Sequence, residues 1–200
     1  MVKAPKVRIT GEHYIDLRLW HTANYLLGIG VRRRKGKFHP LLAASVFAFF
    51  AFEAYLNEVG RQLDSDVWNR EREFFAKGKY RGTLGKFKYL AEKTGYTYSS
   101  GTRPFQTVRS LAKIRDLLAH GRVEAFDVRT SVNRADSVDL TPGLLEWGQV
   151  SFARRAIADV QNLSDGLMAA AKAKCGQWAA GYRSSAFVGV ATSRLISLEE

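Results

Sequence analysis

Residues 40–59 read PLLAASVFAFFAFEAYLNEV. Apolar side chains fill nearly every position as far as Phe52, so a helix formed here would have no polar face over most of its length. Such a helix needs neighbours on several sides, which predicts the central helix of a helical core. Its apolar part, residues 41–52, falls short of the roughly 18 residues that a membrane span needs. We therefore expect a buried helix and no membrane partner.

Helical spacing of apolar residues continues on both sides of this stretch. It predicts further helices over residues 12–28, 66–75, 84–94, 105–120 and 151–170. Asp66 and Ser151 are expected to cap the first turns of two of these helices. Gly95 and Gly121 follow helical segments at the position where a left-handed residue often ends a helix. The pattern as a whole predicts a mainly α-helical bundle.

Two segments carry other signals. Residues 123–128 and 138–140 contain β-branched and aromatic residues and predict a small β-hairpin inserted after the helix that ends near His120. Residues 185–200 carry weak signals, and both a strand and a mobile tail are open for them. A length of 200 residues with 46% hydrophobic composition favours one domain over residues 1–200, with its core over about residues 12–175.

The chain is strongly basic. It has 31 Lys and Arg against 19 Asp and Glu, a net charge of +12, which favours a polyanionic partner but does not distinguish RNA, DNA and an acidic protein. Cys175 has no second cysteine in the sequence, which excludes an intramolecular disulfide and a cysteine-rich zinc site and suits a reducing compartment. The first residues do not resemble a secretory signal, so we expect a cytoplasmic location.

A run of cations precedes the central helix and consists of Arg32, Arg33, Arg34, Lys35 and Lys37. A segment with this much charge cannot pack and is expected to form an exposed loop. Most such runs are simply solvated, and contact with RNA phosphates is the second interpretation. The dependence of RNA affinity on salt concentration separates the two.

The helix predicted over residues 105–120 carries an arginine in an unusual position. At about 100° per residue, its apolar side chains form a stripe on one face, made by Val108, Leu111, Ala112, Leu118 and Ala119. Arg115 lies in the middle of that stripe. Burying an unpaired guanidinium is costly, so this side chain needs a partner. Glu53 on the central helix is one candidate, and a second subunit approaching over the small alanines is another.

Arg115 also begins the segment RDLLAHG of residues 115–121, in which Asp116 comes next and His120 stands five positions on. This pattern of Arg, a polar residue, three further positions and His resembles the signature motif of the HEPN superfamily. The central helix, with Glu53 and Asn57, is similar to the acidic, Asn-containing helix of many HEPN domains. The resemblance implies a HEPN-like helical bundle, from which the predicted hairpin departs.

HEPN proteins with an intact motif are commonly metal-independent ribonucleases, including toxins of toxin–antitoxin pairs and effectors of antiviral defence. The resemblance implies that His120 acts as general acid or base and Arg115 holds the phosphate, with Asp116, Glu53 and Asn57 in support and no metal or other cofactor. The RNA 2′-hydroxyl would attack, leaving a cyclic phosphate and a free 5′-hydroxyl.

Arg115 and His120 are separated by about 140° around a regular helix. They aim at one phosphate only if the last turn unwinds or if two copies of the helix meet. The family is known for a homodimer that brings two motif helices together around one cleft, and the small alanines beside Arg115 suit such an interface. We therefore expect a homodimer.

Two other functions remain open. Some HEPN proteins only bind RNA or nucleotide, and in such a module Arg115 would be locked to Glu53 inside the core. The apolar face around Arg115 could instead dock a partner protein, such as a nucleotidyltransferase antitoxin. His120 has a structural interpretation as well, because a His in the last turn interacts favourably with the partial negative charge of a helix C-terminus.

Overall fold

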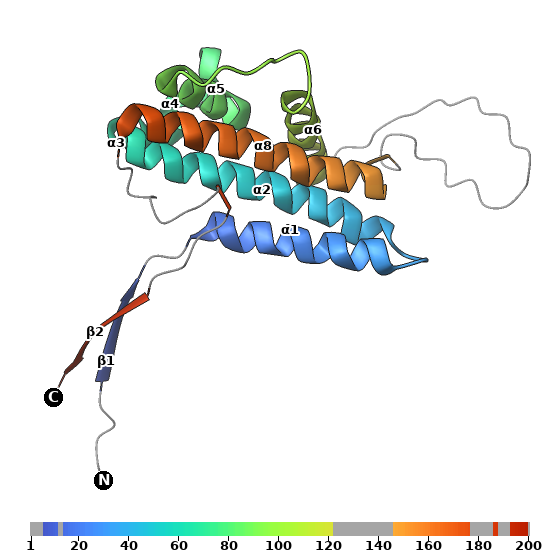
Figure 1. The fold of residues 1–200 in the computed structure, drawn as a ribbon, viewed down its shortest axis with the longest axis horizontal. Coiled ribbons are helices and arrows are strands. Elements are labelled where there is room, and N and C mark those ends of the chain that lie inside the picture. Colours follow the sequence, from blue (N-terminus) through green and yellow to red (C-terminus); the bar gives the residue numbers. More distant parts are fainter. Residues whose placement is uncertain (1–5, 12–13, 122–145, 177–185, 188–192, 200) are drawn as a thin grey trace, which may run out of the picture.

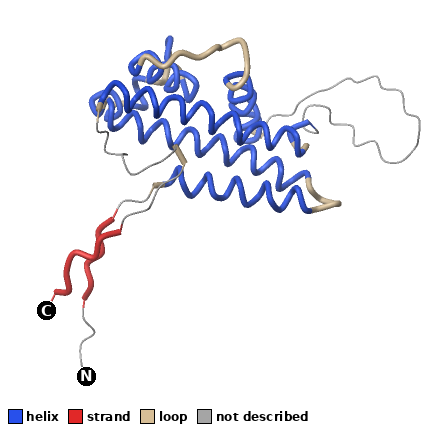
Figure 2. Tube along the Cα trace, in the orientation of Figure 1, coloured by secondary structure: helices blue, strands red, loops and turns tan. Residues whose placement is uncertain are grey.

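The computed structural model describes residues 6–11, 14–121, 146–176, 186–187 and 193–199, and every structural statement below concerns these residues. Most of them are helical, which confirms the predicted mainly α-helical class (Figures 1 and 2). The helices and strands in chain order are β1 Lys6–Gly11, α1 Ile15–Arg32, α2 Phe38–Leu63, α3 Ser65–Asn69, α4 Glu71–Phe74, the 3₁₀ turn η1 Gly78–Tyr80, α5 Gly82–Thr94, α6 Phe105–His120, α8 Val150–Cys175 and β2 Ser193–Glu199.

The central helix lies where the sequence predicts it. α2 runs between α1 and α8, and the shorter helices α5 and α6 pack against it from another side (Figure 1). Its buried residues include Leu41, Phe49, Phe52 and Leu56, which are at most 1% exposed. Among the described helices α2 alone has the length and composition of a membrane span, and more than half of its most apolar window is buried inside the bundle. Packing against neighbouring helices accounts for its apolar character.

Several helix boundaries follow from local signals. α5 ends at Gly95 and α6 ends at Gly121, which have φ angles of 77° and 55° in the left-handed region that glycine tolerates without strain. Both ends confirm the predicted C-terminal glycines. The expected cap at Ser151 was wrong. α8 begins at Val150, so Ser151 lies inside its first turn, and the residue before the helix, Gln149, forms no side-chain cap bond.

The cap of α3 also differs from the expectation. The carboxylate of Asp64 accepts a hydrogen bond from the backbone N–H of Val67 at 3.3 Å, whereas Asp66 lies exposed inside the first turn. Tyr89 and Lys93 of α5 also donate hydrogen bonds to Asp64. The predicted cap was wrong by two residues because both Asp residues suit a helix start, and only the position of α5 selects between them.

Asp64→Ala should therefore lower the free energy of unfolding by about 1–2 kcal/mol, the usual cost of losing an N-cap, and Asp66→Ala should leave it nearly unchanged. Hydrogen bonds lower the pKa of the Asp64 carboxyl below its ordinary value of 3.8, and the bond from Lys93 contributes more than the bond from Tyr89. Because the folded-state pKa is lowered, this stabilisation is complete above the ordinary pKa and is lost as the pH falls through the lowered one. Urea unfolding of the two variants at pH 7 and in acid measures both effects. Equal losses of unfolding free energy in the two variants would contradict Asp64 as the cap of α3.

The two ends of the described chain meet in a two-stranded antiparallel ribbon. β1 pairs with β2 from Lys6 opposite Glu199 to Gly11 opposite Ser193. For residues 185–200 a strand and a mobile tail were both open, and the structure has a strand over residues 193–199. β1 was not predicted, because a short, partly charged segment has little strand signal until its partner from the far end of the chain lies beside it. The hairpin predicted in residues 123–140 lies outside the described residues.

Candidate functional site

An open cleft of about 450 Å³ lies between α2, α4, the start of α5 and α6. It is lined by Phe49, Glu53, Glu71, Arg72, Phe75, Arg81, Gly82, Thr83, Leu84, Lys86, Ala112, Arg115 and Asp116. Three of the five predicted catalytic and supporting residues, Glu53, Arg115 and Asp116, therefore line one cleft, although they come from two helices more than sixty positions apart in the sequence.

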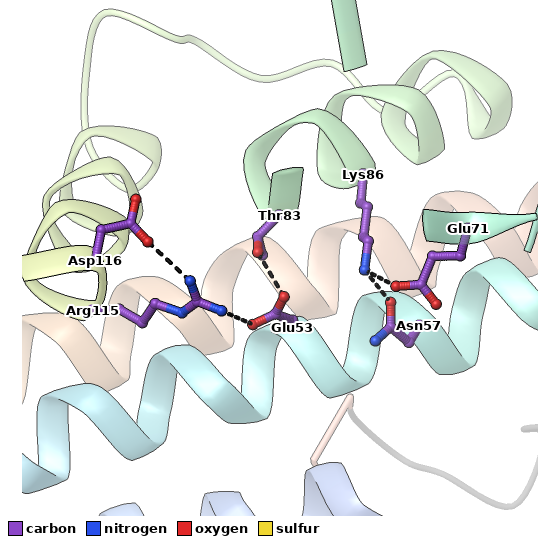
Figure 3. A network of polar contacts seen from close by, with 7 residues as sticks. All are labelled: Glu53, Asn57, Glu71, Thr83, Lys86, Arg115 and Asp116. Atoms are coloured by element: carbon purple, nitrogen blue, oxygen red, sulfur yellow. Dashed lines mark hydrogen bonds and ion pairs between the residues drawn. The ribbon is translucent and has the colours of Figure 1, made fainter. Parts of the chain in front are cut away.

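Arg115 reaches into the cleft from α6 (Figure 3). Its side chain is 36% exposed, so it is not the fully buried arginine that the helical wheel suggested. One terminal nitrogen donates to the Asp116 carboxylate at 2.9 Å, and the other lies 4.0 Å from a carboxylate oxygen of Glu53. A guanidinium has five N–H donors, so donors remain for a ligand in the cleft.

Glu53 faces Arg115 from the middle of α2. One of its oxygens accepts a hydrogen bond from the Thr83 hydroxyl at 2.9 Å, and the other points towards Arg115 (Figure 3). Thr83 stands in the first turn of α5, so this bond ties the start of α5 to α2 next to the arginine. Glu53 thus interrupts the apolar run of α2 where three helices meet at the cleft.

A second set of contacts continues the network along α2. Lys86 of α5 donates to the side-chain oxygen of Asn57 at 2.8 Å and pairs with Glu71 of α4 (Figure 3). The Lys86 side chain is only 7% exposed. A buried ammonium needs such partners because its desolvation is costly. Asn57 does not line the cleft, and its contact with the site is the hydrogen bond from Lys86, which does.

Packing against α2 and α8 fixes the position of α6. Val108, Leu111 and Ile114 are at most 1% exposed and form its buried face. Arg103, just before α6, donates two hydrogen bonds of 2.8 and 2.9 Å to the buried Asp159 of α8. This two-point bond anchors the start of α6 and so helps to determine where Arg115 enters the cleft.

The buried face of α6 follows the predicted stripe but ends before the last turn of the helix. Leu118 is 43% exposed and Ala119 is exposed as well, whereas Val108 and Leu111 are buried as predicted. The last turn of α6 therefore presents an apolar surface, which we name the α6 end face and define as Leu118 and Ala119. Arg115 lies between this exposed surface and the buried face.

His120 is the last residue of α6 and is exposed. It does not line the cleft that holds Arg115. The two residues predicted to be catalytic therefore lie on one helix but do not face one space within a single copy of the chain, as the 140° offset, estimated above from helix geometry, implies. The position of His120 in the last turn also fits its structural interpretation at the helix C-terminus.

The basic run lies away from the cleft. Arg32 is the last residue of α1, and the exposed residues 33–37 join it to α2. Lys37 immediately precedes α2 and is sixteen residues before Glu53, a separation of roughly 24 Å at 1.5 Å per residue. The run is an exposed loop as predicted, and it is not part of the site around Arg115.

Several residues of the cleft were not predicted. Arg72, Arg81 and Lys86 line it, but in the sequence they stand among many similar charges, as in the segment REREFFAKGKYR of residues 70–81. A weak signal was present at Lys86, which interrupts the apolar positions of α5 between Leu84 and Phe87. The cations of the cleft are recognised only once α4 and α5 are placed against α2.

Tyr96 and Tyr98 follow α5 and pack against other aromatic rings. Tyr98 lies 4.8 Å from Phe87 and 5.0 Å from Phe105 between ring centroids, and both tyrosines are half-buried. Their rings are therefore part of the packing between α5 and α6.

Within the described residues, no group of three or more His, Cys, Asp or Glu side chains is placed to hold a metal ion. The chemical groups that the cleft offers are thus guanidinium, ammonium, carboxylate and hydroxyl. No protein-family model, no curated protein and no solved structure matches this chain.

Proposed function

We propose that the chain is a metal-independent endoribonuclease of the HEPN type, acting in the cytoplasm as a toxin or defence component. The proposal rests on the accessibility of the Arg115 guanidinium. Its guanidinium lines an open cleft, is 36% exposed and is only loosely paired with Glu53 at 4.0 Å. A cation kept accessible between two carboxylates can bind a phosphate without first breaking a buried ion pair.

In the proposed reaction the 2′-oxygen of a ribose attacks the adjacent phosphorus. The bond from phosphorus to the 5′-oxygen of the next nucleotide breaks, which leaves a 2′,3′-cyclic phosphate and a 5′-hydroxyl. Arg115 binds the phosphate oxygens as negative charge develops on them. His120 acts as general acid or base and transfers the proton at one of the two reacting oxygens, and water exchanges the proton at the other.

The proposal places Arg115 of one copy and His120 of a second copy at the same phosphate. The α6 end face supports this arrangement, because Leu118 and Ala119 form an exposed apolar surface directly before His120. Two such faces related by a two-fold axis would bury each other and bring each His120 towards the arginine of its partner.

A direct assay of the wild-type protein tests the reaction. Purified protein should cleave single-stranded RNA in EDTA, because neither proposed group acts through a metal. The products should carry 5′-hydroxyl ends, which a polynucleotide kinase labels without prior phosphatase treatment. The same sequence as DNA or as 2′-O-methyl RNA should remain intact, because it lacks the attacking hydroxyl. Cleavage of the DNA, or activity that EDTA abolishes, would contradict the mechanism.

The second candidate is a non-catalytic module that binds RNA or nucleotide. The 2.9 Å bond from Arg115 to Asp116 favours it, because the arginine already has an ion-pair partner in the absence of RNA. The α6 end face would then dock a partner protein such as an antitoxin. If the protein is such a module, wild-type protein should bind RNA but leave a broad panel of RNAs intact.

A further inference from the structure

The charges in the cleft are not balanced. Its three carboxylates are Glu53, Glu71 and Asp116, and each accepts from or pairs with Arg115 or Lys86. These two cations therefore satisfy all the acids that line the cleft.

Two more arginines line the same cleft. Arg72 comes from α4, and Arg81 stands between η1 and α5. Both are exposed, and in the part of the chain that the structure describes neither forms an ion pair or a side-chain hydrogen bond. With Arg115 and Lys86 they give the cleft four cations against three carboxylates, a net charge of +1.

The position of this wall is fixed by close backbone contact. A Cβ atom at Gly85 of α5 would lie only 1.9 Å from the carbonyl carbon and oxygen of Tyr80. The glycine therefore lets α5 pack directly on η1. In addition, the backbone N–H of Gly82 donates to the carbonyl of Phe75 at 3.0 Å. These contacts hold the backbone at Arg81 in place, so its guanidinium is attached to a rigid support next to the cleft.

We propose that Arg72 and Arg81 form a second phosphate-binding subsite, which holds a backbone phosphate of single-stranded RNA next to the phosphate at Arg115. This inference rests on the proposed function for the identity of the ligand as RNA. Guanidinium groups bind phosphate oxygens at two points, and two of them without internal partners favour an anion over a neutral ligand. A cleft of about 450 Å³ falls within the size range of sites for nucleotide-sized ligands. RNA would thus enter along α4 and η1 and not along the basic loop of residues 33–37.

Binding of a fluorescent 2′-O-methyl RNA decamer, which the protein cannot cleave, tests the subsite. The double variant Arg72→Ala/Arg81→Ala should bind more weakly than wild type. The slope of log Kd against log salt should fall by about 0.7, since the subsite holds one phosphate and each lost phosphate contact on a single strand is worth about 0.7. The matched control is Arg70→Ala/Lys77→Ala, which removes two exposed cations of the same segment that do not line the cleft. The control should keep the wild-type slope.

Equal losses of RNA affinity in the two double variants would overturn the subsite, because the overall positive charge of the segment and not the cleft would then explain the binding. A loss found only when residues 33–37 are neutralised would overturn it as well. These outcomes are separate from those of the cleavage assay. If wild-type protein cleaves RNA but the Arg72 and Arg81 variant binds normally, the subsite is wrong and the nuclease stands. If no RNA is cleaved but the variants differ as expected, the subsite stands and the nuclease is wrong.

Discussion

Arg115→Ala and His120→Ala should each slow RNA cleavage by about a hundredfold to ten-thousandfold, the usual contribution of a general acid or base and of a comparable phosphate contact. Arg115→Lys should restore little activity, because an ammonium keeps the charge but cannot grip a phosphate at two points. Rates measured under single-turnover conditions in EDTA give these effects directly.

Thermal unfolding distinguishes a catalytic Arg115 from a structural one. The Arg115 side chain is 36% exposed and Glu53 keeps its hydrogen bond from Thr83, so Arg115→Ala should cost only about 0–1 kcal/mol of stability, as exposed ion pairs do. Lys113→Ala is the matched control, since it removes an exposed cation of the same helix outside the cleft. It should change neither rate nor stability. A large fall in the melting temperature of Arg115→Ala, with wild-type protein inert on RNA, would refute the nuclease.

The second large effect concerns the dimer. Leu118→Arg should convert the protein to a monomer and abolish cleavage, because it places a charge in the centre of the α6 end face. Val31→Arg is the control, because Val31 is exposed to a similar extent, 40% against 43%, but lies on α1. Analytical ultracentrifugation at micromolar concentration reports the oligomeric state. A wild-type monomer, or a Leu118→Arg dimer that still cleaves RNA, would contradict the composite site.

Mixing two inactive variants tests whether the site is shared between copies. An equal mixture of Arg115→Ala and His120→Ala should recover about a quarter of the wild-type activity, because half of the dimers are mixed and each of these has one intact site of two. Activity that stays at the level of the separate variants would show that Arg115 and His120 do not act together across an interface.

The parts of the structure that sequence analysis predicted well depend on local signals. α6 begins and ends where its apolar spacing and Gly121 indicate, and the all-round apolar run of residues 40–59 marks the central helix. Glu53 was found for the same reason, as a charge that interrupts an apolar run. These features are visible in a short window of sequence because neighbouring residues determine them.

The parts that were missed depend on contacts between distant segments. Arg72 and Arg81 become part of the cleft only because α4 and the start of α5 border the same space as α2 and α6. No local pattern separates them from Arg70 or Lys77. The exposure of Leu118 likewise follows from where α8 and α2 leave α6 uncovered. A helical wheel predicts which side chains share a face, but it does not predict how far along the helix that face stays covered.

The β1–β2 ribbon has a mechanical consequence. Lys6 and Glu199 pair at the outer end of the ladder, and Gly11 and Ser193 at the end nearer the helices. Force applied by pulling residues 6 and 199 apart would load the hydrogen bonds one pair at a time, as in opening a zipper, because the antiparallel bonds lie perpendicular to the strands. The hydrogen bonds of the ribbon would therefore break pair by pair at low force. Tension would reach α1 and the helical bundle only after the pair of Gly11 and Ser193 had separated.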